Sequence, residues 1–198
     1  MTKNLRIAVA DDERDTRDFL QELLTRLGHQ VMLAQTGRQL VEQCRLFSPD
    51  LILTDIKMPD MDGIEAAIAV NRDKETPVVL VSGHANPEFL RRVEQHPIMA
   101  YLIKPLKAAD VENAVGVAMA RFAAFSAACK EAQDLRQALD DRKTIERAKG
   151  VVMRRLCMDE PEAFQRMKRF ASNNNRKLAE VAQALLSAEE IFHQLEAL

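Results

Sequence analysis

Short apolar runs alternate with helical patterns over about the first 118 residues. The runs are rich in Val, Ile and Leu without strict alternation, which is typical of parallel strands buried on both faces. Between them, apolar residues recur three and four positions apart, as at Phe19, Leu23 and Leu27, and Gly28 follows where a left-handed residue ends a helix. We therefore predict an α/β doubly wound domain with a five-stranded parallel sheet over residues 1–118. The predicted strands cover residues 5–10, 31–34, 51–54, 78–81 and 100–103.

The strand pattern stops after about residue 111. Residues 111–156 contain no Pro and are dominated by Ala, Leu, Arg, Gln and Glu, which favours one long helix. Within it, apolar residues follow a 3-4-3-4 spacing that predicts a coiled-coil seam in a helical linker, residues 119–142. Packing of this helix against its own domain is the alternative. The seam residues are Phe125, Ala128, Ala132, Leu135 and Leu139.

The last part of the chain, residues 143–198, is predicted to form a small three-helix bundle. A break is expected around residues 157–158, and Asp159, three residues before Glu162 and followed by a Pro, is typical of a helix start. Asn175 is expected to cap the third helix. The apolar faces of the three helices comprise Ile145, Ala148, Val152 and Leu156, then Ala163, Phe164, Met167, Phe170 and Ala171, then Leu178, Val181, Ala182 and Leu185.

Acidic side chains directly follow two of the predicted strands. Asp11 and Asp12 come after the first and Asp55 after the third, so all three carboxylates project from the edge of the sheet where such folds bind ligands. Because clustered carboxylates repel, they favour a hard divalent cation, and Mg²⁺ keeps open positions for phosphate oxygens. Ser82 and Lys104 close the fourth and fifth strands at this edge. The set suits phosphoryl transfer to a carboxylate, with Asp55 as nucleophile and Lys104 and Ser82 stabilising the phosphoryl oxygens.

These residues resemble the receiver domain of bacterial response regulators, over about residues 5–118. The resemblance implies a flavodoxin-like fold and a phosphoacceptor at Asp55 that receives its phosphoryl group from a histidine kinase. No second base is placed for turnover, so we expect a regulatory protein rather than an enzyme. The resemblance is carried by Asp11-Asp12, LILTDIKMPDMDG at residues 51–63, Ser82 and Lys104-Pro105. It implies Mg²⁺ held by Asp12, Asp55 and the main-chain carbonyl of Lys57, with Asp11 acting through water, and a switch pair formed by Ser82 and Tyr101.

Composition and charge narrow the class of protein further. With 47% hydrophobic and 29% charged residues, the 198-residue chain is ordinary for a globular protein and excludes a disordered one. The net charge of −2 conceals an uneven division, because residues 1–118 hold 14 basic and 18 acidic side chains whereas residues 119–198 hold 14 and 12. The widely spaced Cys44, Cys129 and Cys157 indicate reduced thiols in a cytoplasmic protein. No apolar run reaches the length of a membrane span.

Residues 142–177 hold eleven basic and four acidic side chains. On a helix that advances about 100° per residue, Lys143, Arg147 and Arg154 fall in one sector opposite the apolar stripe, with Gly150 beside it. The pattern indicates nucleic-acid binding led by phosphate contacts, since the chain has no Trp for base stacking, with a solvated charged face as the alternative. The candidate contacts are Lys143, Arg147, Lys149, Gly150, Arg154, Arg155, Arg176 and Lys177.

A second resemblance, to the ANTAR domain, covers about residues 137–190. It is carried by IERAKGVVM at 145–153, EAF at 162–164 and RKLAEVA at 176–182. It implies binding of tandem short RNA stem-loops in leader transcripts, and transcription antitermination. We predict a two-component response regulator that dimerises on phosphorylation and acts as an RNA-binding antiterminator. A DNA-binding response regulator, and a receiver with protein-docking output helices, are the alternatives.

Overall fold

The computed structural model describes residues 4–83 and 98–196. It divides into two compact units, Met1–Ser126 and Ala127–Leu198, which are described separately below.

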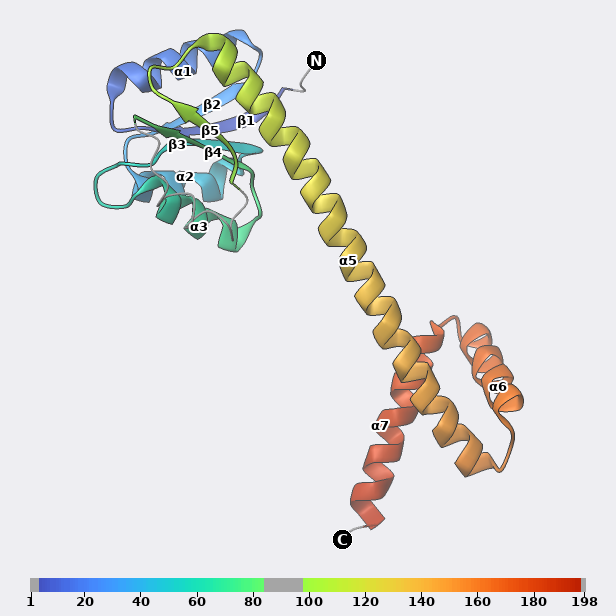
Figure 1. Cartoon of the computed structure of the whole chain (residues 1–198). Coiled ribbons are helices and arrows are strands. Elements are labelled where there is room, and N and C mark those ends of the chain that lie inside the picture. The colour runs from blue at the N-terminus through green and yellow to red at the C-terminus, as the bar shows by residue number, and fades with distance from the viewer. Residues whose placement is uncertain (1–3, 84–97, 197–198) are drawn as a thin grey trace. The chain divides into compact units, whose positions relative to one another are not determined.

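The first unit contains a five-stranded parallel sheet with the order β2-β1-β3-β4-β5 (Figure 1). All five predicted strands are confirmed. Two of them run one residue further than the apolar pattern indicated, to Asp55 and Ser82, so both candidate site residues still belong to the sheet. The strands are β1 (Arg6–Ala10), β2 (Gln30–Ala34), β3 (Leu51–Asp55), β4 (Val78–Ser82) and β5 (Ile98–Ile103).

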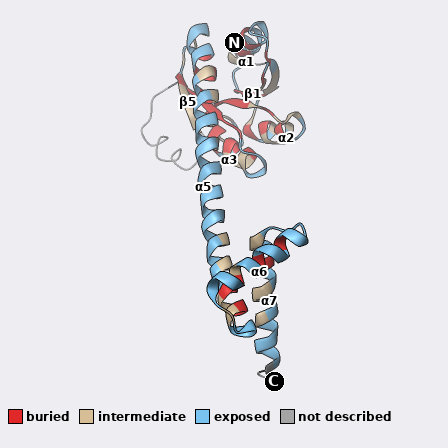
Figure 2. Cartoon of the chain, turned by 90° about the vertical axis from the view of Figure 1, so that its right-hand side faces the viewer, coloured by how far each residue is buried: buried red, intermediate tan, exposed pale blue. Residues whose placement is uncertain are grey.

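Helices cover both faces of this sheet, as the continuous apolar strands predict (Figures 1 and 2). Ile7 and Val9 enter the core shared with α1 and the first turns of α5, whereas Ala8 and Ala10 enter the core shared with α2 and α3. Successive strand residues therefore serve opposite layers. The helices of this unit are α1 (Arg14–Arg26), α2 (Gly37–Phe47), α3 (Gly63–Asp73) and the beginning of α5 (Ala108–Leu156).

The second unit is built from the remainder of α5, α6 (Glu160–Asn173) and α7 (Leu178–Glu196). Its small core joins Ala148 and Val152 of α5 to residues of the other two helices, which confirms the predicted bundle. Two residues assigned to apolar faces, Leu156 and Phe170, are instead more than half exposed. Leu156 is the last residue of α5, and Phe170 lies in the last turn of α6.

Helix ends follow the local chemistry at most predicted positions. Asp159 caps α6 by accepting a hydrogen bond from the Glu162 N–H at 2.9 Å, and Gly28 ends α1 with a φ of +87°. The prediction that Asn175 caps α7 is wrong. Asn175 has a φ of +49° and donates its N–H to the Ser172 carbonyl, so it ends α6 in a left-handed stop. Asn serves here because its side chain tolerates this conformation better than most.

None of the described helices is both long and apolar enough to cross a membrane.

Buried His29 gives the first unit a pH-dependent stability. Its Nδ1 accepts a hydrogen bond from the Leu5 N–H at 3.3 Å, and burial lowers the pKa of His29 below the usual 6.5. The unfolded chain therefore takes up this proton more readily, so the contribution to stability is present above pH 6.5 and is lost as the pH falls through the folded pKa. We expect His29→Asn, which keeps an acceptor but cannot titrate, to flatten the acid side of the stability curve. Urea unfolding between pH 5 and 8 measures this, and parallel curves for the two proteins would contradict it.

Candidate functional site

Three carboxylates meet at the carboxyl edge of the sheet. Asp11 follows β1, Asp12 comes next in the chain, and Asp55 is the last residue of β3. One oxygen from each lies within 4.8 Å of the other two, with Asp11 and Asp55 buried and Asp12 exposed. The structure therefore confirms the prediction that these three acids lie close together.

Lys104, one residue after β5, forms ion pairs with two of these acids and with the neighbouring Glu13. Its Nζ is 3.0 Å from Asp55 Oδ2, 3.0 Å from Asp11 Oδ2 and 2.9 Å from Glu13 Oε2. Although burial alone lowers the pKa of Lys104, the three carboxylates outweigh it and hold the pKa above its ordinary value. The ammonium is therefore charged at every physiological pH.

The surroundings of Asp11 fit a cation. Burial raises the pKa of Asp11 above its usual value, against the opposing effect of Lys104 and a backbone hydrogen bond from Glu13. Among the residues that the structure describes, none donates a well-directed hydrogen bond to its Oδ2, although Lys104 Nζ is 3.0 Å away. A buried carboxylate oxygen with unused acceptor capacity, beside two further carboxylates, is a ligand set that Mg²⁺ prefers.

Gly63 allows α3 to begin directly against the end of β3. A Cβ at this position would overlap the Asp55 carbonyl oxygen and lie 2.7 Å from Thr54 Oγ1. The Gly63 N–H donates to the Ile56 carbonyl at 2.9 Å, which closes the loop that follows Asp55. The absence of a side chain at 63 thus sets the position of the candidate phosphoacceptor.

Arg17 holds the backbone of Asp11 and Asp12 in place through hydrogen bonds. It is buried, and its Nη1 donates to the carbonyls of Asp11 at 2.7 Å and Asp12 at 2.9 Å. Sequence reasoning missed Arg17 and Glu13, and it quoted Gly63 only as part of the motif at residues 51–63. Glu13 stands next to Asp12 in the sequence, but only the fold shows that Lys104 reaches it.

The remaining predicted receiver residues lie near this edge. Ser82 is buried at the end of β4, and its carbonyl accepts from the Lys104 N–H at 2.9 Å. Tyr101, in β5, is half-buried and packs against the core shared with α2 and α3. Lys57 has an exposed side chain, and its backbone N–H lies 3.4 Å from Asp55 Oδ1. Their predicted roles stay predictions.

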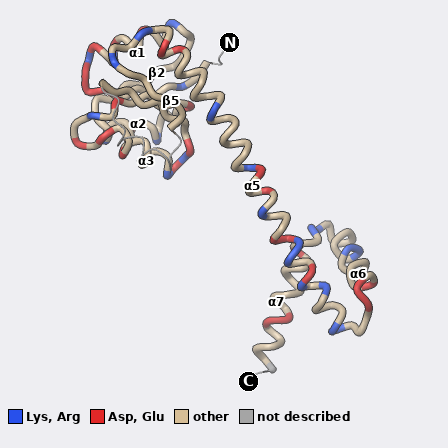
Figure 3. Tube along the Cα trace, viewed as in Figure 1, with Lys and Arg blue, Asp and Glu red and all other residues tan. Residues whose placement is uncertain are grey.

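The second unit carries a separate, basic surface on the last turns of α5 and the neighbouring helices (Figure 3). Lys143, Arg147 and Arg154 are exposed there, as predicted. Arg155 is also exposed, and Arg176 and Lys177 are exposed just before α7 begins.

Lys149, another of the candidate RNA contacts, does not belong to this exposed surface. It is buried, and its Nζ lies 2.7 Å from both Glu146 Oε2 and Glu160 Oε1. Hydrogen bonds to these carboxylates raise the pKa of Lys149 above its usual value. It ties α5 to α6, because the helix turns it towards the bundle and away from the sector of Arg147.

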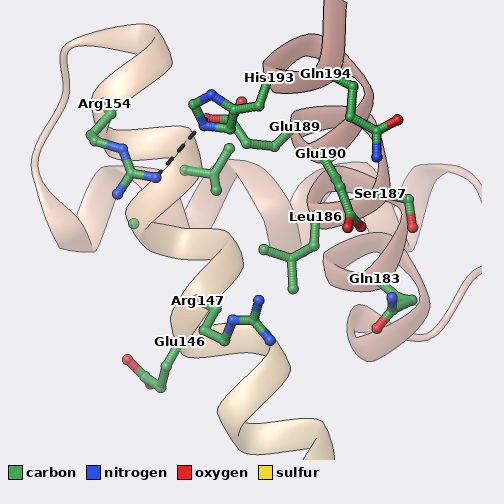
Figure 4. Close-up of a pocket in the computed structure, with 12 residues that line it drawn as sticks. Glu146, Arg147, Arg154, Gln183, Leu186, Ser187, Glu189, Glu190, His193 and Gln194 are labelled. Atoms are coloured by element: carbon green, nitrogen blue, oxygen red, sulfur yellow. Dashed lines mark ion pairs between the residues drawn. The ribbon is translucent and has the colours of Figure 1, made fainter. Parts of the chain in front are cut away.

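A groove of about 900 Å³ separates the end of α5 from the second half of α7 (Figure 4). Arg147 and Arg154 line one wall, and Gly150 leaves space between them, with only Arg154 Nη1 within 4 Å of a hypothetical Cβ, at 3.6 Å. Gln183 and Ser187 of α7 line the opposite wall. This groove combines two guanidinium groups with neutral hydrogen-bonding side chains and with the carboxylates of Glu146, Glu189 and Glu190.

Fold and site together define the class of protein. A five-stranded parallel sheet that carries an acid cluster, Ser82 and Lys104 at its carboxyl edge is the arrangement of a receiver domain. In agreement, residues 7–116 match the response regulator receiver domain family, and residues 133–186 match the ANTAR domain family. The chain belongs to the response regulators that join a receiver domain to an ANTAR domain, which makes it a two-component regulator with an RNA-binding, antiterminator-type output.

Individual relatives agree with this assignment. The transcriptional regulatory protein PdtaR of Mycobacterium tuberculosis is 34% identical over 182 residues, which cover 91% of this chain and 89% of the relative. The N-terminal domain of a response regulator/sensory box/GGDEF three-domain protein from Carboxydothermus hydrogenoformans superposes with a TM-score of 0.57 at 27% identity, covering 61% of this chain and 98% of that one. Chemotaxis protein CheY4 of Vibrio cholerae shares the fold, with a TM-score of 0.55 at 23% identity over 57% of this chain and 97% of its own.

Proposed function

We propose that a histidine kinase phosphorylates this regulator on Asp55, and that phosphorylation promotes dimerisation and binding of stem-loop RNA in leader transcripts. The bound protein then acts as a transcription antiterminator. The observation that supports this most directly is the placement of Asp55 Oδ2 3.0 Å from the Lys104 ammonium and beside Asp11 and Asp12. We assign residues 1–118 to the receiver, 119–142 to a coiled-coil linker and 143–198 to the RNA-binding bundle.

Phosphoryl transfer in this proposal needs one nucleophile and positive charge around it. A carboxylate oxygen of Asp55 attacks the phosphorus of the kinase phosphohistidine, the P–N bond breaks, and the imidazole leaves with the electron pair and takes a proton from solvent. Lys104 neutralises negative charge on the transferred group. Mg²⁺, when held by Asp12, Asp55 and the Lys57 carbonyl, with Asp11 acting through water, supplies further positive charge to the phosphoryl oxygens.

The acyl phosphate changes the charge at one buried position. A phosphoryl group carries about −1.5 to −2 charge and three acceptor oxygens, in place of the single negative charge of the carboxylate. Lys104 already faces this position, and Ser82 ends the neighbouring strand. Both side chains can therefore donate hydrogen bonds to the oxygens of a phosphoryl group on Asp55. We propose that Ser82 moves to the phosphoryl group and that Tyr101 turns inward, which alters the face formed by β5 and the beginning of α5.

Dimerisation is supported by the exposed seam of α5. Phe125, Leu135 and Leu139 are 44%, 61% and 58% exposed, so the chain itself leaves most of the predicted seam uncovered. The same helix contributes Val111 and Val115 to the receiver core and further residues to the bundle core. A second copy that pairs along residues 119–142 would bury the seam and bring two bundles to two stem-loops, which raises affinity through avidity.

The proposal is tested with beryllofluoride, a non-covalent mimic of the phosphoryl group. With Mg²⁺ present, we expect beryllofluoride to shift the full chain towards dimer in sedimentation, and to strengthen binding of a synthetic RNA with two tandem stem-loops by about tenfold or more, within the range for avidity. Affinity should fall steeply with salt, because each phosphate contact releases counterions. Unchanged self-association and unchanged RNA affinity would refute the proposal.

Charge reversal identifies the nucleic acid and the surface that binds it. Arg147→Glu should weaken RNA binding by about tenfold or more, as expected when an attractive phosphate contact becomes repulsive. Lys130→Glu makes the same charge change on an exposed turn of α5 outside the candidate surface and serves as the control. Duplex DNA of the same sequence should compete poorly. Equal competition would favour the DNA-binding alternative, and an Arg147→Glu protein that still functions in cells would favour protein docking.

A further inference from the structure

Helix α7 continues well past the region that matches the ANTAR family. The match ends at residue 186, whereas α7 runs from Leu178 to Glu196. The additional turns lie along the end of α5 and form one side of the groove that contains Arg147 and Arg154 (Figure 4). They therefore border the surface to which RNA binding is assigned.

One carboxylate on these additional turns engages the candidate RNA-binding arginines. Glu189 Oε2 lies 2.8 Å from Arg155 Nε, and Glu189 Oε1 lies 4.0 Å from Arg154 Nη2 and 3.6 Å from His193 Nε2. The Phe192 ring covers the Arg155 guanidinium, with 5.1 Å between its centroid and Cζ. The Glu189 side chain is only 13% exposed, so α7 presents this carboxylate to α5 and not to solvent.

A carboxylate at this place competes chemically with an RNA phosphate. Guanidinium groups bind carboxylates and phosphates through the same N–H donors. The groove also contains the carboxylates of Glu146 and Glu190, which offset the charges of Arg147 and Arg154. A phosphate that binds Arg155 through Nε must therefore displace Glu189, and one that binds Arg154 meets the Glu189 carboxylate 4.0 Å from Nη2. Arg147, in contrast, forms no ion pair with any described residue.

We propose that Glu189 is an internal competitor of RNA phosphate, which holds Arg154 and Arg155 until a phosphodiester group displaces it. The inference rests on the proposed function, because it requires these arginines to contact RNA. The proposal assigns to the α7 extension a role in regulating RNA affinity. Arg147 contacts an RNA phosphate first, and Arg154 and Arg155 bind a phosphate only after Glu189 is displaced. Only an RNA with phosphates near Arg147 and also near Arg154 and Arg155 therefore binds with the full affinity.

The decisive comparison is between Glu189→Gln and Glu190→Gln in the full chain. Both variants remove one negative charge from the same groove, but Glu190 is exposed and only Glu189 is bonded to Arg155. We expect Glu189→Gln to strengthen binding of the tandem stem-loop RNA by about three- to fivefold, as the loss of a partly exposed ion pair allows. Glu190→Gln should change it by less than about twofold. The dependence of log Kd on log salt should also steepen for Glu189→Gln, because the freed arginines then neutralise RNA phosphates, which release their condensed counterions.

Further variants separate the outcomes. Glu189→Ala should tighten binding in the same direction, and circular dichroism shows whether the helices of both variants remain intact. Equal effects of the two Gln variants, or weaker RNA binding by folded Glu189→Gln and Glu189→Ala, would overturn the competitor role. If Arg147→Glu loses RNA binding while Glu189→Gln binds like the unmodified chain, the competitor role fails and the proposed function stands. If no protein binds RNA at all, including the unmodified chain, the proposed function itself is overturned.

Discussion

Asp55→Asn should abolish phosphoryl uptake while the receiver stays folded. An amide has no nucleophilic oxygen comparable to a carboxylate, so we expect incorporation from a small phosphodonor or a kinase to fall by at least about a hundredfold, to background. The side chain keeps its shape, and Lys104 keeps Asp11 and Glu13 as partners at 3.0 and 2.9 Å. The variant should also lose the beryllofluoride-induced increase in dimer and in RNA affinity. Phosphoprotein gels and sedimentation measure both results.

A nearby acid provides the matched control for this variant. Asp60 lies in the same loop, five positions further on, is exposed and has a φ of +67°, a conformation that Asn tolerates well. Asp60→Asn therefore makes the same chemical change without touching the acid cluster, and should accept phosphate normally. Phosphorylation of the Asp55→Asn protein at the normal level would contradict the assignment of the phosphoacceptor.

Gly63→Ala should strongly lower the stability of the receiver, although it adds only one methyl group. The new Cβ would overlap the carbonyl oxygen of Asp55, and because the obstacle is backbone, α3 or the end of β3 must move. We expect a loss of about 3 kcal/mol in the free energy of unfolding, typical of severe overpacking. Displacement of the Asp55 backbone should also slow phosphoryl uptake. Urea unfolding and phosphorylation rates measure the two effects.

Gly116→Ala is the control for this substitution. Gly116 lies within α5, and a Cβ there would meet nothing within 4 Å. Because Gly is a poor helix former, Ala should stabilise the protein by about 0.5–1 kcal/mol. Opposite signs for the two Gly→Ala changes would show that packing at residue 63, and not glycine in general, is required. Similar stability of the Gly63→Ala protein and the unmodified chain would contradict this requirement.

Lys104 explains how the acid cluster is held together in the unphosphorylated protein. The carboxylates of buried Asp11 and Asp55 and of exposed Glu13 surround the Lys104 ammonium. This positive charge offsets part of the repulsion between the carboxylates. The opposite arrangement is found in the second unit, where Glu189 lies among Arg154, Arg155 and His193. In each place an internal ion pair occupies the group that an incoming phosphate would engage.

Much of the receiver was predictable because its information is local. Apolar runs identified the strands, and residues that directly follow a parallel strand must lie at one edge of the sheet, which placed Asp11, Asp12 and Asp55 together. Asp159 and Gly28 were likewise readable, since a cap or a left-handed stop depends on a few neighbouring residues. Asn175 was misassigned because Asn serves equally well in a cap and in a left-handed stop, and only the backbone distinguishes them.

Tertiary structure alone decided which charged groups are available to a ligand. Lys149 and Arg147 are both basic residues of one helix, yet the packing of α6 buries Lys149 between two glutamates and leaves Arg147 exposed. Contacts between Glu13 and Lys104, and between Glu189 and Arg155, join residues that are far apart in the chain. The sequence by itself therefore determined most of the elements, the class of protein and the edge of the sheet at which the three acids meet. Charge pairing across elements depends on distances that no local pattern encodes, so the availability of each cation was settled only by the fold.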